Sequence, residues 1–64
     1  MNCYEIKYDG VWEASNLGNT PDEAIENMAK DDGYESLASL CAAESLDAAK
    51  FSAVKSMFRN AAAQ

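Results

Sequence analysis

The sequence predicts an α+β fold in which an N-terminal β-hairpin is followed by two short helices and a C-terminal third strand. Apolar and polar residues alternate over residues 3–14, on both sides of an Asp-Gly turn signal. Residues 20–33 carry helix start and stop signals around apolar residues at helical spacing. A two-stranded sheet alone is marginally stable in water, so a further strand is expected. We expect all 64 residues to form a single small domain with a thin core.

The hairpin covers the segment CYEIKYDGVWEAS. Its first strand has the two-residue period of a half-buried strand, with apolar residues at Tyr4, Ile6 and Tyr8. Asp9 and Gly10 are residue types that accept the positive φ angles of a tight turn. We therefore expect the chain to reverse direction at these two residues.

The register of this hairpin decides which face Trp12 occupies. A two-residue loop would pair Tyr8 with Val11 and would place Trp12 beside Lys7, on the polar face. Pairing Tyr8 with Trp12 instead gathers the apolar side chains on one face, and it requires an extra residue near Gly10. We expect this second register. Its buried face consists of Tyr4, Ile6, Tyr8, Trp12 and Ala14, and its other face of Lys7 and Glu13.

The first helix is predicted within residues 20–33. Thr20 is a suitable N-cap, Pro21 suits the first helical position, and Glu23 completes a capping box. Gly33 predicts the end of the helix. The buried stripe of this helix is Ala24, Ile25, Met28 and Ala29. A second, shorter helix is expected to follow, with inward residues Leu37, Leu40 and Cys41 and with Tyr34 at its entrance.

The C-terminal stretch, SLDAAKFSAVKSMFRNAAAQ, is compatible with two structures. Helical spacing of apolar residues favours a third helix, with a stripe of Phe51, Val54, Met57, Phe58 and Ala61. The need for a third strand favours an extended conformation near residues 50–57. We choose the strand, and a third helix remains the alternative.

Charge is the most informative property of the composition. Residues 1–47 carry all eleven acids and two lysines, which gives 2 − 11 = −9, while residues 48–64 carry three basic residues and no acid, which gives +3 and a total of −6. An acidic body repels nucleic acid and anionic membranes, and it attracts basic proteins. We expect the basic segment to lie against this body, docked through Phe51 and Val54. Its charged residues are Lys50, Lys55 and Arg59.

No residue pattern points to a metal, a cofactor or a catalytic site. Histidine is absent, and Cys3 and Cys41 are too few for a four-ligand zinc site. A calcium loop beginning at Asp31 or Asp32 needs a glutamate at its twelfth position, where the sequence has alanine. We therefore expect no cofactor, no metal, no enzymatic activity and no bond between the two cysteines.

The candidate site is a run of acidic residues. Six acids lie within residues 22–35, with Lys30 as the only base. The first two suit a helix N-terminus, and Glu26 can pair with Lys30 one turn later. Asp31 and Asp32 stand where acids oppose the helix dipole, so either Asp32 caps the second helix or both acids contact a partner. The residues predicted to bind a partner are Glu26, Asp31, Asp32 and Glu35.

The segments YEIKYDGVWEAS and TPDEAIENMAKDDGYESLASLC, within residues 4–41, resemble small acidic proteins encoded by bacteriophages and mobile elements. In those proteins a hairpin precedes a helix that opens with Ser/Thr-Pro-x-Glu-Ala and closes at Gly-Tyr. Some of them inhibit host defence, including anti-CRISPR proteins, which are often short, acidic and without enzymatic activity. The resemblance implies a phage-encoded inhibitor.

Two functions follow as hypotheses. The first is a non-enzymatic inhibitor whose acidic surface binds a basic, nucleic-acid-binding host protein or defence complex, in part by mimicking nucleic acid. No direct contact with nucleic acid or with a membrane is expected, and the absence of a signal-peptide pattern favours the bacterial cytoplasm. The second is a self-associating structural or regulatory module, in which a sheet edge or the apolar C-terminal stretch forms a homodimer.

Overall fold

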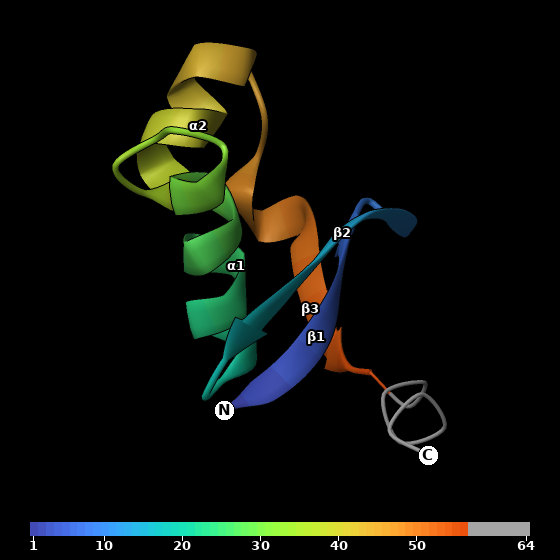
Figure 1. Ribbon diagram of the computed structural model, residues 1–64. Coiled ribbons are helices and arrows are strands. Elements are labelled where there is room, and N and C mark those ends of the chain that lie inside the picture. The colour runs from blue at the N-terminus through green and yellow to red at the C-terminus, as the bar shows by residue number, and fades with distance from the viewer. Residues whose placement is uncertain (57–64) are drawn as a thin grey trace.

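The computed structural model describes residues 1–56. It confirms the predicted α+β class, with a hairpin, two helices and a third strand (Figure 1). The sheet is antiparallel with strand order β2-β1-β3, and helix α1 packs across one of its faces. The elements are β1 (Asn2–Tyr8), β2 (Val11–Gly18), α1 (Pro21–Asp31), α2 (Leu37–Glu44), the 3₁₀ helix η1 (Ala48–Lys50) and β3 (Phe51–Lys55).

The C-terminal segment forms β3, which pairs with β1 and makes the first strand of the chain the central strand of the sheet. Tyr8 is opposite Phe51, and Tyr4 is opposite Lys55. The choice of a strand over a helix is therefore confirmed for residues 51–55. Three residues of the helical alternative lie outside the described residues, namely Met57, Phe58 and Ala61.

The basic segment docks on the acidic body as expected, but not through both of the expected side chains. The ring centroids of Phe51 and Tyr8 are 4.7 Å apart with an interplanar angle of 65°, which is a favourable edge-to-face contact. Ala53 also packs against the core. The predicted contact through Val54 is wrong, because Val54 faces away from α1 and is 54% exposed. Arg59 lies outside the described residues.

The hairpin differs from the predicted register at its turn. Tyr8 pairs with Val11, not with Trp12 as predicted, and the strands then shift by one residue so that Ile6 pairs with Ala14. Asp9 and Gly10 have φ angles of 52° and 84°. A two-residue loop with two positive φ angles matches the twist of the flanking strands, so the turn stays tight. The extra residue that the sequence required is therefore in β2, at Glu13, and not near Gly10.

The position of this bulge reverses the predicted faces of Trp12 and Glu13. Trp12 is opposite Lys7 on the outer face of the sheet, where its side chain is 56% exposed. The prediction that Trp12 shares the buried face of Tyr4 and Ile6 is wrong. Glu13 does not face Lys7, because the bulge turns its side chain toward the helices.

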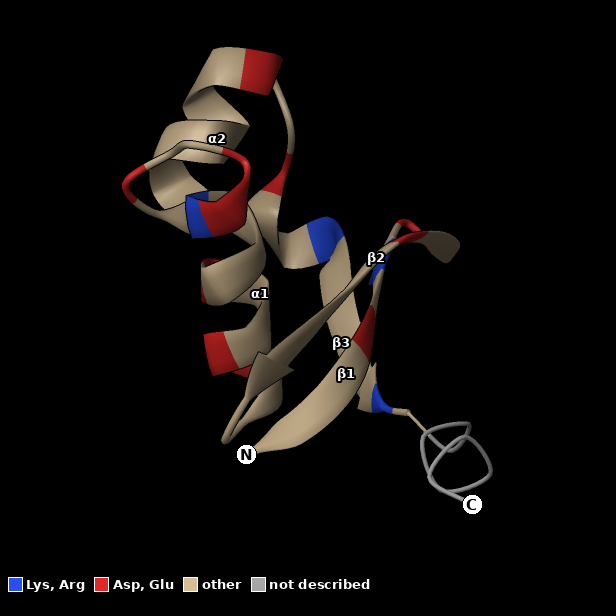
Figure 2. Cartoon of the chain, viewed as in Figure 1, with Lys and Arg blue, Asp and Glu red and all other residues tan. Residues whose placement is uncertain are grey.

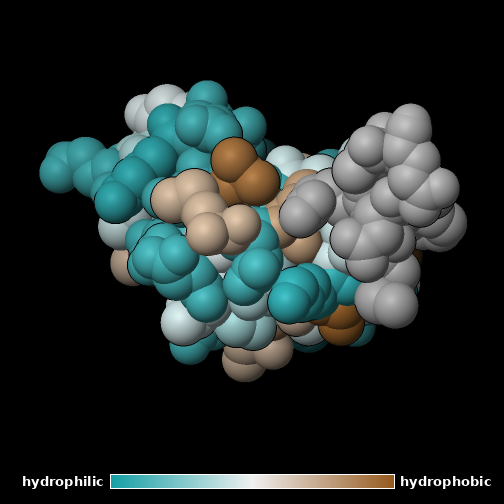
Figure 3. Space-filling model, turned by 60° about the horizontal axis from the view of Figure 1, so that its bottom comes forward, coloured by the Kyte–Doolittle hydropathy of each residue, from teal (hydrophilic) through white to brown (hydrophobic). Residues whose placement is uncertain are grey.

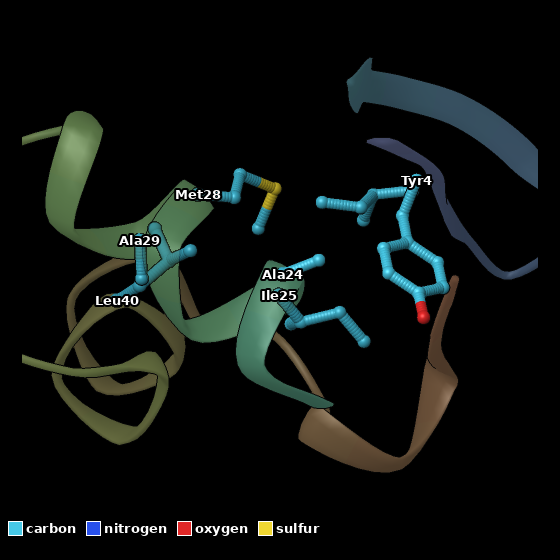
Figure 4. Close-up of a cluster of buried hydrophobic side chains, with 7 residues drawn as sticks. Tyr4, Ala24, Ile25, Met28, Ala29 and Leu40 are labelled. Atoms are coloured by element: carbon cyan, nitrogen blue, oxygen red, sulfur yellow. The ribbon is translucent and has the colours of Figure 1, made fainter. Parts of the chain in front are cut away.

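The core lies between the sheet and α1, and α2 closes it at one end (Figure 4). Ile6, in the middle of β1, is completely buried. Gly18 lies so close to α1 that a Cβ added there would be 2.6 Å from the backbone nitrogen of Ala24. The end of β2 therefore packs directly on the first turn of the helix. The buried hydrophobic residues are Tyr4, Ile6, Ala24, Ile25, Met28, Ala29, Leu40 and Cys41, which include the whole predicted stripe of α1.

Helix α1 begins and ends as its sequence predicts. The Glu23 N–H donates to the Thr20 hydroxyl at 3.1 Å, and the Glu23 carboxylate accepts from the Asn19 N–H at 3.0 Å. At the other end, the Gly33 N–H donates to the Lys30 carbonyl and the Tyr34 N–H to the Ala29 carbonyl, each at 3.0 Å. This pair of bonds is the Schellman arrangement that stops a helix.

The N-cap of α2 is Ser36, and not Asp32. The Ser36 hydroxyl accepts a hydrogen bond from the Ser39 N–H at 3.2 Å, whereas Asp32 forms the C-cap of α1. Ser36 directly precedes the first residue of α2 and has the extended backbone of an N-cap, which Asp32 is too far along the chain to supply. The capping role proposed for Asp32 at α2 is therefore wrong.

The two cysteines are free thiols, as expected. Cys3 is half-buried on the outer face of the sheet, opposite Leu17. Cys41 is buried on α2, which lies on the other side of the sheet. The sheet thus separates the two thiols.

Candidate functional site

Glu26 has a structural role that limits its availability to a partner. Its side chain is half-buried on α1, and its Oε1 accepts a hydrogen bond from the Leu37 N–H at 3.0 Å. Leu37 is the first residue of α2, so its N–H has no acceptor within the helix. The Glu26 carboxylate therefore holds the N-terminus of α2 against α1, a contact different from the predicted pair with Lys30.

Asp31 also has a partner within the chain. It is the last residue of α1, and its Oδ2 accepts a hydrogen bond from Asn16 Nδ2 at 2.8 Å. This bond joins the C-terminal end of α1 to β2. The Asp31 side chain is nevertheless exposed, so its second oxygen can accept a bond from another molecule.

Asp32 and Glu35 are the exposed acids that follow α1. Figure 2 shows acidic residues at the C-terminal end of α1 and in the loop between α1 and α2. The structure therefore brings three of the four predicted residues, Asp31, Asp32 and Glu35, to the exposed end of α1 and the loop that follows it. Glu26 lies one turn or more behind them on α1.

Next to this loop the structure has an open groove with a volume of about 330 Å³. The two buried residues of its lining, Met28 and Leu40, are apolar and form its floor. The three carboxylates of the lining are exposed and form its edge, and none of the lining residues is a lysine or an arginine. The lining residues are Glu13, Met28, Asp32, Tyr34, Leu40, Glu44, Leu46 and Phe51. Of the four predicted site residues, only Asp32 lines the groove.

The three carboxylates reach the groove from different elements. Glu13 is the extra residue of the bulge in β2, Asp32 is the C-cap of α1, and Glu44 is the last residue of α2. The hydroxyl of Tyr34 donates to Glu44 Oε2 at 2.8 Å, which fixes the direction of that carboxylate. The bond to Glu44, with smaller effects of burial and of nearby Asp32, raises the pKa of Tyr34 above its ordinary value.

The apolar side of the groove depends on two tight backbone features. Ser45 has a φ of 60°, and the Leu46 N–H that follows donates to the Cys41 carbonyl at 2.9 Å. This turn brings Leu46 back over the end of α2. Phe51, which also lines the groove, packs edge-on against Tyr8.

Tyr8 also fixes the connection between α2 and β3. Its hydroxyl accepts a hydrogen bond from the Asp47 N–H at 3.0 Å, although the two residues are 39 positions apart. The segment that carries Leu46 is therefore held to the tip of β1, and the groove has a defined wall on this side.

The chemistry of this groove is that of a binding site for a cation with an apolar stem. Apolar side chains can cover the stem while the carboxylates face its charge. Over residues 1–56 no group of three or more His, Cys, Asp or Glu side chains is placed to hold a metal ion.

Sequence reasoning missed most of the groove. The sequence predicts only structural roles for Tyr34 and Phe51 and no role for Glu44, because these residues are distant in the chain and meet only in the folded protein. Glu13 was assigned to the outer face through the register error. The signal for Glu13 was present: the Asp9-Gly10 turn and the Ile6–Ala14 pairing are compatible only with an extra residue between them in β2.

Known proteins provide no further guidance on this site. No protein-family model, no curated protein and no solved structure matches the chain. Within residues 1–56, no helix has the length and apolar character needed to cross a membrane.

Proposed function

We propose that this protein is a non-enzymatic inhibitor that binds a basic, nucleic-acid-binding protein. The observation that supports this proposal best is the acidic groove with its apolar floor, adjacent to the exposed acids Asp31, Asp32 and Glu35. A surface of this kind offers both a charge and an apolar contact to a basic partner. A purely solvated acidic face would offer only the charge.

The inhibition follows from competition for the same charges. A protein that binds nucleic acid presents lysine and arginine side chains to phosphates, and carboxylates at the surface of an acidic protein can occupy those side chains. Long-range attraction between the −6 chain and a basic partner raises the association rate, and salt reduces this effect. Mimicry of nucleic acid is thus the mechanism of the proposed inhibition.

The biological setting of the proposal comes from the resemblance of residues 4–41 to small phage and mobile-element proteins. In that setting the partner is a host nucleic-acid-binding protein or defence complex in the bacterial cytoplasm. The charge distribution is compatible with this setting, since nucleic-acid-binding proteins carry basic patches that attract an acidic protein.

The test is affinity purification from a bacterial lysate with mass spectrometry, followed by binding measurements on the purified partner over a salt series. We expect a basic partner whose affinity falls steadily with rising salt. Asp31→Lys combined with Asp32→Lys should abolish binding, because both charges reverse next to the groove. An affinity for the partner that does not change with salt would contradict the electrostatic mechanism.

The control for this variant uses the other end of α1. Asp32→Lys and Asp22→Lys each change the net charge by the same amount, and both residues are exposed. If the site is local, only Asp32→Lys weakens binding strongly. If both variants weaken it equally, the partner responds to net charge and not to this surface. Far-ultraviolet circular dichroism must show that both variants are folded.

A second candidate function, self-association as a structural or regulatory module, is favoured by the outer face of the sheet. Three large apolar side chains are exposed there, Trp12 at 56%, Val54 at 54% and Leu17 at 49%. The charges of Glu5 and Lys7 on the same face cancel, so this face does not repel a second copy as the acidic faces do.

We rank self-association second because the outer face of the sheet is small for a stable interface. Three strands about 4.8 Å apart and five residues of about 3.4 Å each cover about 250 Å², whereas a stable interface needs about 800 Å² from each partner. The end of the molecule that is turned forward in Figure 3, which is a different side from the outer face of the sheet, is mostly hydrophilic with small apolar areas. Sedimentation tests the alternative, and Trp12, the only tryptophan, would report association through a concentration-dependent shift of its fluorescence.

A further inference from the structure

We propose that the groove is a binding site for one arginine side chain of the partner protein. This inference rests on the proposed function and deepens it, because it names the chemical group that the groove recognises and the residues that recognise it. The argument uses the floor, the edge and the aromatic rings of the groove in turn.

The floor of the groove fits an alkyl chain. Met28 and Leu40 are buried core residues whose surfaces close the groove from below, and Leu46 and Phe51 form its sides. An arginine or lysine side chain has an apolar stem that is stabilised when it lies along such a surface. A phosphate, a carboxylate or a fully hydrated ion gains nothing from this floor.

The edge of the groove requires a positive charge on the occupant. Glu13, Asp32 and Glu44 all line the groove, and no lysine or arginine lines it to neutralise them. Nucleic acid and acidic peptides are therefore repelled. The Glu44 carboxylate is already oriented by the Tyr34 hydroxyl at 2.8 Å, so one acceptor is in place before the occupant arrives.

The aromatic rings and the carboxylate acceptors favour arginine over lysine. Tyr34 and Phe51 both line the groove, and a guanidinium group stacks on such rings and loses its weak hydration easily. Its five N–H donors also form a planar fork that matches carboxylate acceptors. A lysine ammonium offers three donors at one point and holds its water more strongly.

The experiment titrates the ¹⁵N-labelled protein with three matched peptides and follows backbone amide shifts. The peptides are acetyl-Gly-Xaa-Gly-amide, where Xaa is arginine, lysine or citrulline, the neutral analogue of arginine. We expect saturable shifts at residues of the groove with the arginine peptide, weaker binding of the lysine peptide and no saturable binding of the citrulline peptide.

Variants locate the site. Asp32→Asn and Glu44→Gln should each weaken the arginine peptide about twofold to fivefold, the range expected when one partly exposed charge pair is lost. Asp22→Asn removes the same charge outside the groove and should leave the affinity unchanged. Tyr34→Leu removes a ring and should reduce the preference for arginine over lysine.

The inference is wrong if citrulline binds as well as arginine, if the shifts are spread over the whole surface, or if Asp22→Asn weakens binding as much as Asp32→Asn does. Its failure can be separated from failure of the proposed function. If the partner binds the double variant Glu44→Gln/Tyr34→Leu as tightly as it binds the unmodified protein, the arginine site is wrong and the inhibitor function is not affected. Saturable arginine binding in the groove without any basic partner in the purification supports the site and contradicts the inhibitor function.

Discussion

One face of the sheet is covered by the rest of the chain, and the other face is exposed. On the inner face, Tyr4 and Ile6 are buried under α1 (Figure 4). On the outer face, Trp12 in β2 and Val54 in β3 are more than half exposed, although both strands pair directly with β1. A three-stranded sheet with one layer of helices has a core on one side only. Stability should therefore depend on the inner face, while the outer face is free to change.

The largest expected effect is at the centre of the inner face. Ile6→Ala removes apolar contacts from a completely buried position, and such changes cost about 2–5 kcal/mol. This is comparable with the whole stability of a domain of this size, about 5 kcal/mol, so we expect a largely unfolded protein. Ile6→Val, at about 0.5–1.5 kcal/mol, keeps the effect measurable in urea denaturation.

Val54→Ala is the matched change on the outer face. Because Val54 is 54% exposed, we expect its cost to stay within about 0.5 kcal/mol. Equal costs for Val54→Ala and Ile6→Val would show that the outer face is covered in solution, and the comparison between the faces would then fail.

The next effect concerns the contact between β2 and α1. In Gly18→Ala the new Cβ would lie 2.6 Å from the Ala24 nitrogen and 3.0 Å from its Cα, and backbone atoms cannot move aside as a flexible side chain can. We expect a loss of about 1–3 kcal/mol, as for overpacking in a core. Ser15→Ala, at an exposed position of the same strand, is the control for thermal denaturation. A Gly18→Ala variant as stable as this control would show that the helix does not rest on β2.

A smaller effect separates structural acids from free acids. Glu26→Ala leaves the Leu37 N–H without its acceptor, and we expect a cost of about 1 kcal/mol. Asp32→Ala should be neutral or slightly stabilising, because it removes a negative charge from the C-terminal end of α1. Urea denaturation of both variants tests this difference. If Asp32→Ala were less stable than Glu26→Ala, the Glu26 carboxylate would not stabilise the contact between α1 and α2.

The smallest effect is a change with pH at the edge of the groove. The hydrogen bond to Glu44 raises the pKa of Tyr34 above its ordinary value of 10.0. A group with a raised folded-state pKa contributes stability that is fully present below its unfolded pKa and is lost as the pH rises through the folded one. The free energy of unfolding should therefore decrease above pH 10, and part of this decrease should come from Tyr34. The Tyr34→Phe variant should not show that part of the decrease. Spectrophotometric titration of tyrosinate measures it, and an ordinary Tyr34 pKa would mean that the Glu44 bond is absent.

The parts of this fold that are local in sequence could be predicted. Thr20, Pro21 and Glu23 determine the start of α1 within four residues of one another, and Gly33 stops it. Their hydrogen bonds do not depend on distant parts of the chain. The prediction of the buried stripe of α1 is also correct, because the helical spacing of its apolar residues is a local pattern.

The register and the groove could not be predicted in the same way. The tight turn at Asp9-Gly10 and the Ile6–Ala14 pairing are both correct features, but they are offset by one residue. Taken together, the two features require an extra residue in β2, but packing against α1 decides whether Trp12 or Glu13 is the extra one. The groove has the same limitation, because Glu13, Glu44 and Phe51 meet only after the sheet and both helices have assembled.

The strand order has a consequence for synthesis of the protein on the ribosome. β1 emerges first, yet one of its edges waits for β3, since Tyr4 pairs with Lys55. Until residues 51–55 leave the exit tunnel, the nascent chain holds a hairpin and helices around a strand with an open edge, which is a surface prone to wrong pairing. We expect ribosome-bound chains arrested with residues 1–47 outside the tunnel to be cut rapidly by protease. Chains with residues 1–56 outside should resist, because β3 then pairs with β1 and closes its open edge.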